Sequence, residues 1–184
     1  MENLKISNIN DKEKGYILGL LAGDGYLFHD KKSRHYHIEF YLNSIKDKAI
    51  RDLIEEIIKK LELTPQKYFD KRFNCVRIRT YSKELYEYIT KRSYNENFDF
   101  KIGFVSGFID SDGYYNKKKS TLVIINTNLE KIKLANLYLK DLGINSSINK
   151  KFMSKKYKNQ PYNLYISVKF KSLKHLSQKV SIAG

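Results

Sequence analysis

The sequence predicts an α+β protein built as a tandem, pseudo-twofold repeat of one helix-strand-strand-helix-strand-strand-helix unit. Two observations lead to this fold class. Residues 15–26 (GYILGLLAGDGY) and 103–114 (GFVSGFIDSDGY) align without a gap at an offset of 88. Each segment is then followed by the same succession of helical and strand periodicities. We therefore expect two halves, residues 1–97 and 98–184, joined in the polar segment 93–99.

The elements of the first half follow from local patterns. The repeated segment opens the half as a helix, and a short strand leaves it. After that, alternation of apolar and polar residues predicts strands, and apolar residues three and four apart predict helices. In chain order, these elements are expected at residues 34–43 (strand), 50–61 (helix), 67–70 and 75–80 (strands) and 83–91 (helix).

The second half repeats this order. Its repeated segment is again followed by a short strand. The later elements are expected at residues 121–126 (strand), 129–142 (helix), 146–152 and 163–170 (strands) and 172–180 (helix). Gly143 ends the middle helix, because glycine accepts the left-handed conformation that is common just after a helix.

The amino-acid composition limits the kinds of binding partner and the cellular compartment that we expect. The chain carries 35 Lys and Arg against 20 Asp and Glu, a formal net charge of +15. Such a charge predicts a polyanionic partner, nucleic acid before an anionic membrane surface. The one cysteine, Cys75, excludes a disulfide framework and fits a reducing compartment. No apolar run reaches the roughly 18 residues of a membrane span, so we expect an intracellular protein, cytoplasmic or organellar.

Small residues recur every four positions in both repeated segments, at Gly15, Gly19 and Gly23 and at Gly103, Gly107 and Ser111. On a helix these positions form one stripe. Glycine costs a helix about 1 kcal/mol relative to alanine, so the stripe needs a compensating gain. Close approach of a second helix supplies that gain, and we expect the two repeated helices to pack on each other.

Each stripe ends in Asp-Gly, at Asp24-Gly25 and Asp112-Gly113. The glycine suits the left-handed position after a helix, which leaves each carboxylate at a helix C-terminus, where negative charge is unfavourable. Paired helices bring the two carboxylates together, and a hard divalent cation such as Mg²⁺ relieves both penalties. The alternative is that each Asp-Gly is only a turn. Its repetition at one offset favours the metal site.

At this point the motifs resemble those of the LAGLIDADG homing endonucleases: residues 17–25 read ILGLLAGDG and residues 105–113 read VSGFIDSDG. The resemblance covers nearly the whole chain and is to the monomeric, two-motif members. It implies two antiparallel sheets that form a saddle over double-stranded DNA, with the motif helices paired at the centre. It also implies site-specific, Mg²⁺-dependent cleavage of both strands at a long, imperfectly palindromic site, with Mn²⁺ or Ca²⁺ as substitute ions.

The resemblance implies the catalytic acids as well. The family's acid is the residue before the last glycine, which here is Asp24 or Asp112. Together with the residues that precede them, Gly23 and Ser111, these aspartates form the expected metal set. Asp110 matches an earlier aspartate of the family motif that the first half lacks, so we expect it to be a structural cap or turn residue.

Other members of the catalytic site are less specified by the motif. The family has a polar amide near the metal, which maps onto Asn43 and Asn126 and makes them second catalytic candidates; both could instead belong to helix N-caps. The family's lysine near the scissile phosphate cannot be assigned by symmetry, although Lys117, Lys118 and Lys119 follow the second motif. Three histidines, His29, His35 and His37, suggest a zinc site only weakly, because no cysteine is close in the sequence.

Apolar and polar residues alternate along the predicted strands, which gives each sheet an apolar face and a polar face that could lie in the major groove of DNA. The polar positions, which we expect to contact DNA, are His35, His37, Glu39, Tyr41, Arg77, Arg79, Tyr165 and Lys169, with Arg34 at the start of a strand and Lys117–Lys119 in a turn. The alternative is an ordinary solvated sheet face. The excess of positive charge favours DNA.

The sequence therefore predicts a monomeric, site-specific homing endonuclease associated with an intron or intein. Two alternatives share the scaffold: an intron RNA maturase and a non-catalytic DNA-binding regulator. The presence of both acids, Asp24 and Asp112, favours the nuclease.

Overall fold

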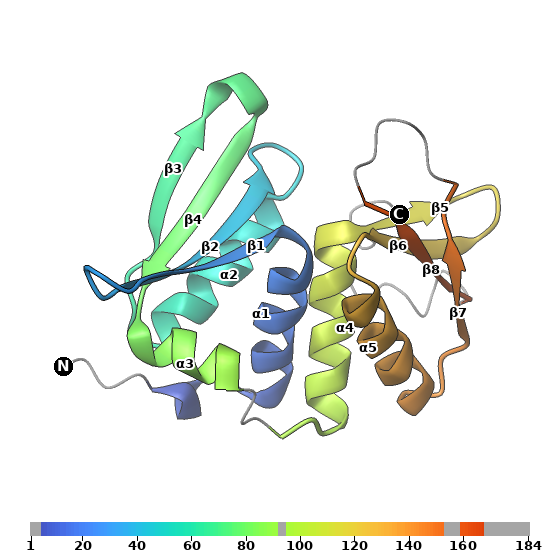
Figure 1. The fold of residues 1–184 in the computed structure, drawn as a ribbon, viewed down its shortest axis with the longest axis horizontal. Helices are drawn as coiled ribbons and strands as arrows, with labels where there is room; N and C mark the ends of the chain where they lie inside the picture. The colour runs from blue at the N-terminus through green and yellow to red at the C-terminus, as the bar shows by residue number, and fades with distance from the viewer. Residues whose placement is uncertain (1–4, 92–94, 153–158, 168–184) are drawn as a thin grey trace.

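The structure, a computed structural model, describes residues 5–91, 95–152 and 159–167. It contains two four-stranded antiparallel sheets with two long helices side by side between them. In Figure 1 these helices, α1 (Asp11–Asp24) and α4 (Phe98–Asp112), stand in the middle, with one sheet on either side. The α+β class and the repeated plan are confirmed. The helix expected at residues 172–180 lies outside the described residues, as does Lys169.

The first half contains α1 and the sheet that follows it. After α1 come β1 (Gly25–Asp30), β2 (His35–Asn43), α2 (Lys48–Lys60), β3 (Gln66–Asp70), β4 (Cys75–Tyr81) and α3 (Lys83–Lys91), with short 3₁₀ turns at Ile6–Asn8 and Lys71–Phe73. The sheet order is β1-β2-β4-β3. Asn10 and Glu13 form a capping box that fixes the start of α1.

The second half follows the same order from α4. It contains β5 (Gly113–Asn116), β6 (Thr121–Asn126), α5 (Leu129–Asp141), β7 (Ser146–Lys150) and β8 (Tyr162–Ile166). The sheet order β5-β6-β8-β7 repeats that of the first half. Gly143 has φ +72° after α5, as its place at the end of the predicted helix requires.

The two motif helices touch along their glycine stripes. A Cβ atom added at Gly15 would lie 2.8 Å from the backbone nitrogen of Phe104, and one at Gly19 would lie 2.8 Å from that of Phe108. In return, a Cβ at Gly107 would lie 2.7 Å from the backbone nitrogen of Leu20. These are backbone atoms, which cannot move aside as the end of a side chain can. The predicted pairing of the motif helices is therefore confirmed, and α1 and α4 meet almost backbone to backbone.

The glycines after the two aspartates differ from our expectation. Gly25 has φ −106° and Gly113 has φ −87°, so both are extended and neither is left-handed. Each helix passes directly into its strand, and the strand starts against the last helical turn. A Cβ at Gly113 would lie 2.9 Å from the Cα of Ile109, and one at Gly25 would lie 3.0 Å from the Cβ of Leu21. Glycine is needed here for close approach.

The core lies between each sheet and the helices. On β2 the residues Ile38, Phe40 and Leu42 are fully buried on the apolar face, as their alternation predicts. The opposite face of each sheet is not covered by any helix in the described residues. Of the helices that the structure describes, none is long and apolar enough to cross a membrane.

Candidate metal and DNA site

The two acids end α1 and α4 at the same end of the helix pair, beside the sheets (Figure 1). Asp24 is the last residue of α1, and Gly23 precedes it. A Cβ at Gly23 would lie 2.9 Å from the carboxyl carbon of Asp112, so the Asp112 side chain lies against the last turn of α1. Ser111 also contacts this turn, while its hydroxyl donates to the Phe108 carbonyl at 3.0 Å. The structure thus brings the end of α1 and the Asp112 carboxylate together.

Asn126, at the end of β6, contacts an acid of the candidate site but is not the helix N-cap that it could have been. Its amide nitrogen donates to the Asp112 carboxylate at 2.5 Å and lies 3.5 Å from the carbonyl oxygen of Ala22. Its side-chain oxygen accepts from the backbone N–H of Asn128 at 2.7 Å, in the turn before α5. The N-cap of α5 is Asn128 itself. Asn126 therefore ties the turn to the acid.

Asn43, its counterpart at the end of β2, is used differently. Its side-chain oxygen accepts from the backbone N–H groups of Ile45 at 3.0 Å and Lys46 at 2.9 Å. Its own N–H donates to the Asp47 carboxylate at 2.8 Å, and Asp47 is the N-cap residue of α2. The oxygen of this amide therefore holds the local turn, so the two halves of the site are not equivalent.

Lys131, in the first turn of α5, was not found from the sequence. Its ammonium donates to the carbonyl oxygen of Ala22 at 2.8 Å and so links the second half to the end of α1. Burial lowers the pKa of Lys131, while the nearby charge of Asp112 acts in the opposite direction. Counted from Asn126 and its counterpart Asn43, the position that corresponds to Lys131 is Lys48, which is exposed at the start of α2. The repeat alone therefore gave no sign that Lys131 reaches the end of α1.

Asp110 has a structural role, but it is not the cap or turn residue that we expected. It lies inside α4, is fully buried, and accepts a hydrogen bond from the Tyr16 hydroxyl of α1 at 2.8 Å. Burial and the charge of Asp110 raise the pKa of Tyr16 far above its usual range. This bond joins the two motif helices below the acids.

The polar face of the first sheet carries most of the predicted DNA contacts. His37 stacks on Phe28 with ring centres 4.5 Å apart, and burial and the charge of Arg79 lower its pKa. His29 lies on the other face, where it stacks on Tyr36 at 4.1 Å. Within residues 5–91, 95–152 and 159–167, no group of three or more His, Cys, Asp or Glu side chains could hold a metal. The histidines form no zinc site there.

The remaining predicted contacts lie mostly at exposed positions. Arg34 and His35 are exposed at the turn between β1 and β2, and Lys117–Lys119 are exposed in the turn between β5 and β6. Tyr165 accepts a hydrogen bond from Asn163 at 2.9 Å on the second sheet. Glu39 differs from this group: only 2% of it is exposed, because Arg79 and Tyr41 cover it. It was predicted to meet DNA, but in this structure it is held by its neighbours.

Comparison with solved structures identifies this arrangement. The homing endonuclease I-DmoI, crystallised with DNA and Ca, matches with a TM-score of 0.69 over 94% of this chain and 97% of its own, at 22% identity. The fold is that of the LAGLIDADG homing endonucleases. Residues 99–176 also match the model of the LAGLIDADG-like domain. The match to I-DmoI, a two-motif enzyme of similar length, extends the resemblance to the first half.

Other proteins are also similar to this chain in fold or in sequence. The N-terminal LAGLIDADG domain of WhiA matches with a TM-score of 0.65 over 96% of this chain and 84% of its own, at 19% identity. Two uncharacterised proteins of Methanocaldococcus jannaschii are 28% identical over 74% of this chain and 31% identical over 80%. The chain spans 51% and 61% of their lengths, respectively.

Proposed function

We propose that this protein is a monomeric, site-specific endonuclease that hydrolyses both strands of a long, imperfectly palindromic DNA site. One observation carries the proposal: the helix ends that bear Asp24 and Asp112 lie together. The Asp112 carboxylate lies against the last turn of α1 and accepts a hydrogen bond from Asn126. The net charge of +15 and the polar sheet faces support DNA as substrate. I-DmoI has been crystallised with DNA and Ca or Mn.

The donor set at the helix ends suits a hard divalent cation. Asp24 and Asp112, at the ends of α1 and α4, would supply carboxylate oxygens, and Gly23 and Ser111 before them would supply backbone carbonyls. Oxygen ligands of this kind select Mg²⁺, Mn²⁺ or Ca²⁺ over softer metals. When bound, such an ion would activate a water molecule and offset the charge on the reacting phosphate.

The chain's own residues have distinct roles in this proposal. Asn126 fixes one Asp112 oxygen, so that carboxylate keeps its orientation before substrate arrives. Lys131 places a positive charge beside Asp112 and on the open carbonyl end of α1, where the helix dipole favours a cation. Asp24 and Asp112 are the groups that we propose to bind metal for cleavage of the two DNA strands.

Replacement of each acid tests the proposal. We expect Asp24→Asn or Asp112→Asn to abolish double-strand cleavage of a random double-stranded DNA library in Mg²⁺, with binding retained. Stability should hold or rise, because a like-charge pair at two helix C-termini is relieved. Asp99→Asn is the matched control, since this exposed aspartate lies in the first turn of the same helix as Asp112. Cleavage by either variant at the wild-type rate, or by the wild type in EDTA, would contradict the assignment.

A DNA-binding protein without nuclease activity is the second candidate, and the maturase is a third. The use of Asn43 in a local turn, where Asn126 reaches an acid, favours these alternatives in the first half. The same fold also occurs in WhiA. Sequence-selective binding of DNA with no cleavage in Mg²⁺ or Mn²⁺ would favour the regulator, and selective binding of structured RNA would favour the maturase.

A further inference from the structure

The polar face of the first sheet encloses one buried carboxylate. Glu39 accepts from the Tyr41 hydroxyl at 2.5 Å and from the guanidinium of Arg79, and it lies 3.5 Å from His37. Burial raises the pKa of Glu39. The hydrogen bonds from Tyr41 and Arg79 and the positive charges of Arg79 and Arg77 have the larger effect, so the pKa of Glu39 is lowered. The carboxylate is thus a fixed negative charge beneath the two arginines.

The two arginines on this face are held in different ways. Arg79 directs its guanidinium onto Glu39 and donates from the remaining amine to the Tyr81 hydroxyl at 3.0 Å, and its side chain is 20% exposed. Arg77 approaches the Glu39 carboxylate through Nε, at 3.9 Å. Its side chain is 36% exposed. Arg79 is therefore directed inward, and Arg77 lies nearer the surface.

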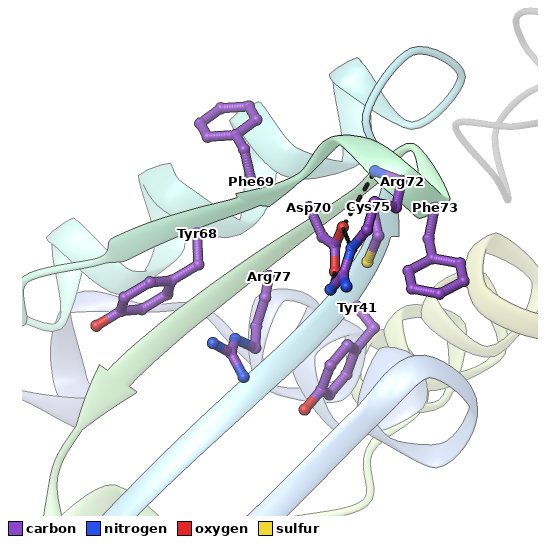
Figure 2. A pocket seen from close by; sticks show the side chains of 8 residues that line it. All are labelled: Tyr41, Tyr68, Phe69, Asp70, Arg72, Phe73, Cys75 and Arg77. Carbon is purple, nitrogen blue, oxygen red and sulfur yellow. Dashed lines mark hydrogen bonds and ion pairs between the residues drawn. The ribbon is translucent and has the colours of Figure 1, made fainter.

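Arg77 lies on an aromatic platform beside an open cavity. In the strand register it is opposite Tyr41 on β2 and Tyr68 on β3, and its guanidinium centre lies 4.9 Å from the Tyr68 ring centre. Figure 2 shows Tyr41, Tyr68 and Arg77 on the same side of the sheet and Phe69 on the other. These side chains line one part of a cavity of about 630 Å³.

The other end of this cavity is formed by the β3–β4 turn. Arg72 lies there, but it binds Asp70 through Nε at 3.1 Å and through a terminal amine at 2.9 Å (Figure 2). Its guanidinium is also 5.5 Å from the ring centre of Phe73. Arg72 thus directs two of its nitrogens onto a carboxylate within its own turn, whereas Arg77 directs only one toward Glu39.

We propose that Arg77 reads a guanine in the major groove through this cavity, and that Glu39 and Arg79 are the residues that position it. With Nε toward Glu39, the two terminal amines of Arg77 form the far edge of the guanidinium. That edge has the planar, two-donor geometry that matches guanine O6 and N7. The Tyr68 ring packs against the guanidinium, with 4.9 Å between their centres, and so limits the freedom that Arg77 would lose on binding. The inference rests on the proposed function, because it requires sequence-specific DNA binding.

The test is selection of bound duplexes from a random DNA library in EDTA, so that no cleavage is needed. We expect the sites selected by the wild type to hold an invariant guanine at one position. Arg77→Lys should reduce the preference for that guanine by about 10- to 100-fold, the discrimination of one bidentate pair, and leave other positions unchanged. Arg72→Lys is the matched control, because it makes the same change in the same cavity and should leave the profile intact.

Glu39→Gln separates positioning from simple stability. It should relax the same guanine position as Arg77→Lys and no other, whereas a merely structural role would lower the melting temperature and relax all positions together. Retention of the guanine by Arg77→Lys would overturn the inference, as would equal loss at every base, which indicates a phosphate contact. If the wild type selects no sequence at all, site-specific DNA recognition fails with it. If selection succeeds without cleavage in Mg²⁺, only the nuclease proposal fails.

Discussion

The Ala22 carbonyl oxygen accepts from Lys131 and from Asn126, both in the second half, although Ala22 lies in the first. These bonds cross the pseudo-twofold axis at the end of α1. The equivalent lysine of the first half, Lys48, is exposed at the start of α2, and Asn43, the counterpart of Asn126, holds a local turn. The site is therefore electrostatically asymmetric even though its two acids occupy the same position in the repeated motif.

Removal of the Lys131 charge should strengthen cation binding at the helix ends. We expect Lys131→Met to bind Ca²⁺ about fivefold more tightly, because a unit charge at several ångströms contributes roughly 1 kcal/mol at high effective dielectric constants. Titration calorimetry with Ca²⁺ measures this without any cleavage assay. Lys133→Met is the control, since Lys133 is half exposed on the same helix and pairs with Glu130 at 2.9 Å. Weaker Ca²⁺ binding by Lys131→Met would show that the ammonium organises the site.

At the scale of elements, the α1–α4 contact decides whether the two halves form one molecule. Alanine normally stabilises a helix relative to glycine by about 1 kcal/mol. At Gly19 we expect the opposite sign, because the added Cβ would lie 2.8 Å from backbone atoms of Phe104 and Phe108. Gly19→Ala should lower the free energy of unfolding by about 1–3 kcal/mol, or roughly 2–10 °C in melting temperature.

A glycine without close neighbours provides the control for this packing. Nothing lies within 4 Å of a Cβ added at Gly143, whose φ of +72° asparagine also tolerates. Gly143→Asn should therefore melt close to the wild type. A melting temperature for Gly19→Ala at or above the wild-type value, measured by calorimetry, would mean that the helices separate enough in solution to admit a side chain.

Sequence periodicity predicted the elements well because burial repeats at fixed intervals. The strand at Thr121–Asn126 and the helix at Lys83–Lys91 have the predicted bounds, and the glycine stripes pair the motif helices. The prediction that Gly25 and Gly113 are left-handed was wrong, because their conformation depends on how each strand leaves its own helix. The periodicity of the sequence does not record how a strand leaves its helix.

The site was predicted less completely than the fold, for the same physical reason. The motif indicated Asp24 and Asp112, whose helix ends the structure brings together. It could not indicate Lys131, because that contact joins residues 109 apart in the chain. Nor could alternation show that Glu39 lies beneath Arg79, since polar residues on one strand face look alike until cross-strand neighbours are placed. Long-range contacts decide which polar residues remain available to a ligand.

At the scale of the whole molecule, the two sheets offer different surfaces. The polar face of the first sheet carries Arg77, Arg79 and Glu39. Among the strand residues that the structure describes, the corresponding face of the second sheet has no charged side chain; its members include Tyr114, Thr121, Asn149, Asn163 and Tyr165. Three lysines of that half, Lys117–Lys119, lie in the exposed turn between β5 and β6.

This difference predicts unequal reading of the two half-sites. Arginine on a sheet face can form paired hydrogen bonds with guanine, whereas lysine in a turn acts as a point charge toward phosphate. We expect the half-site bound by residues 1–97 to be read more stringently, above all at G·C pairs, and the other half-site to tolerate substitution. Replacing Lys117, Lys118 and Lys119 together by alanine should weaken binding to all sequences alike. It should also lower the slope of log affinity against log salt by about 1–3 units. Binding of every single-base variant of the target, measured at two salt concentrations, tests both effects. Equal stringency in the two half-sites, or tighter reading on the lysine-rich side, would refute the prediction.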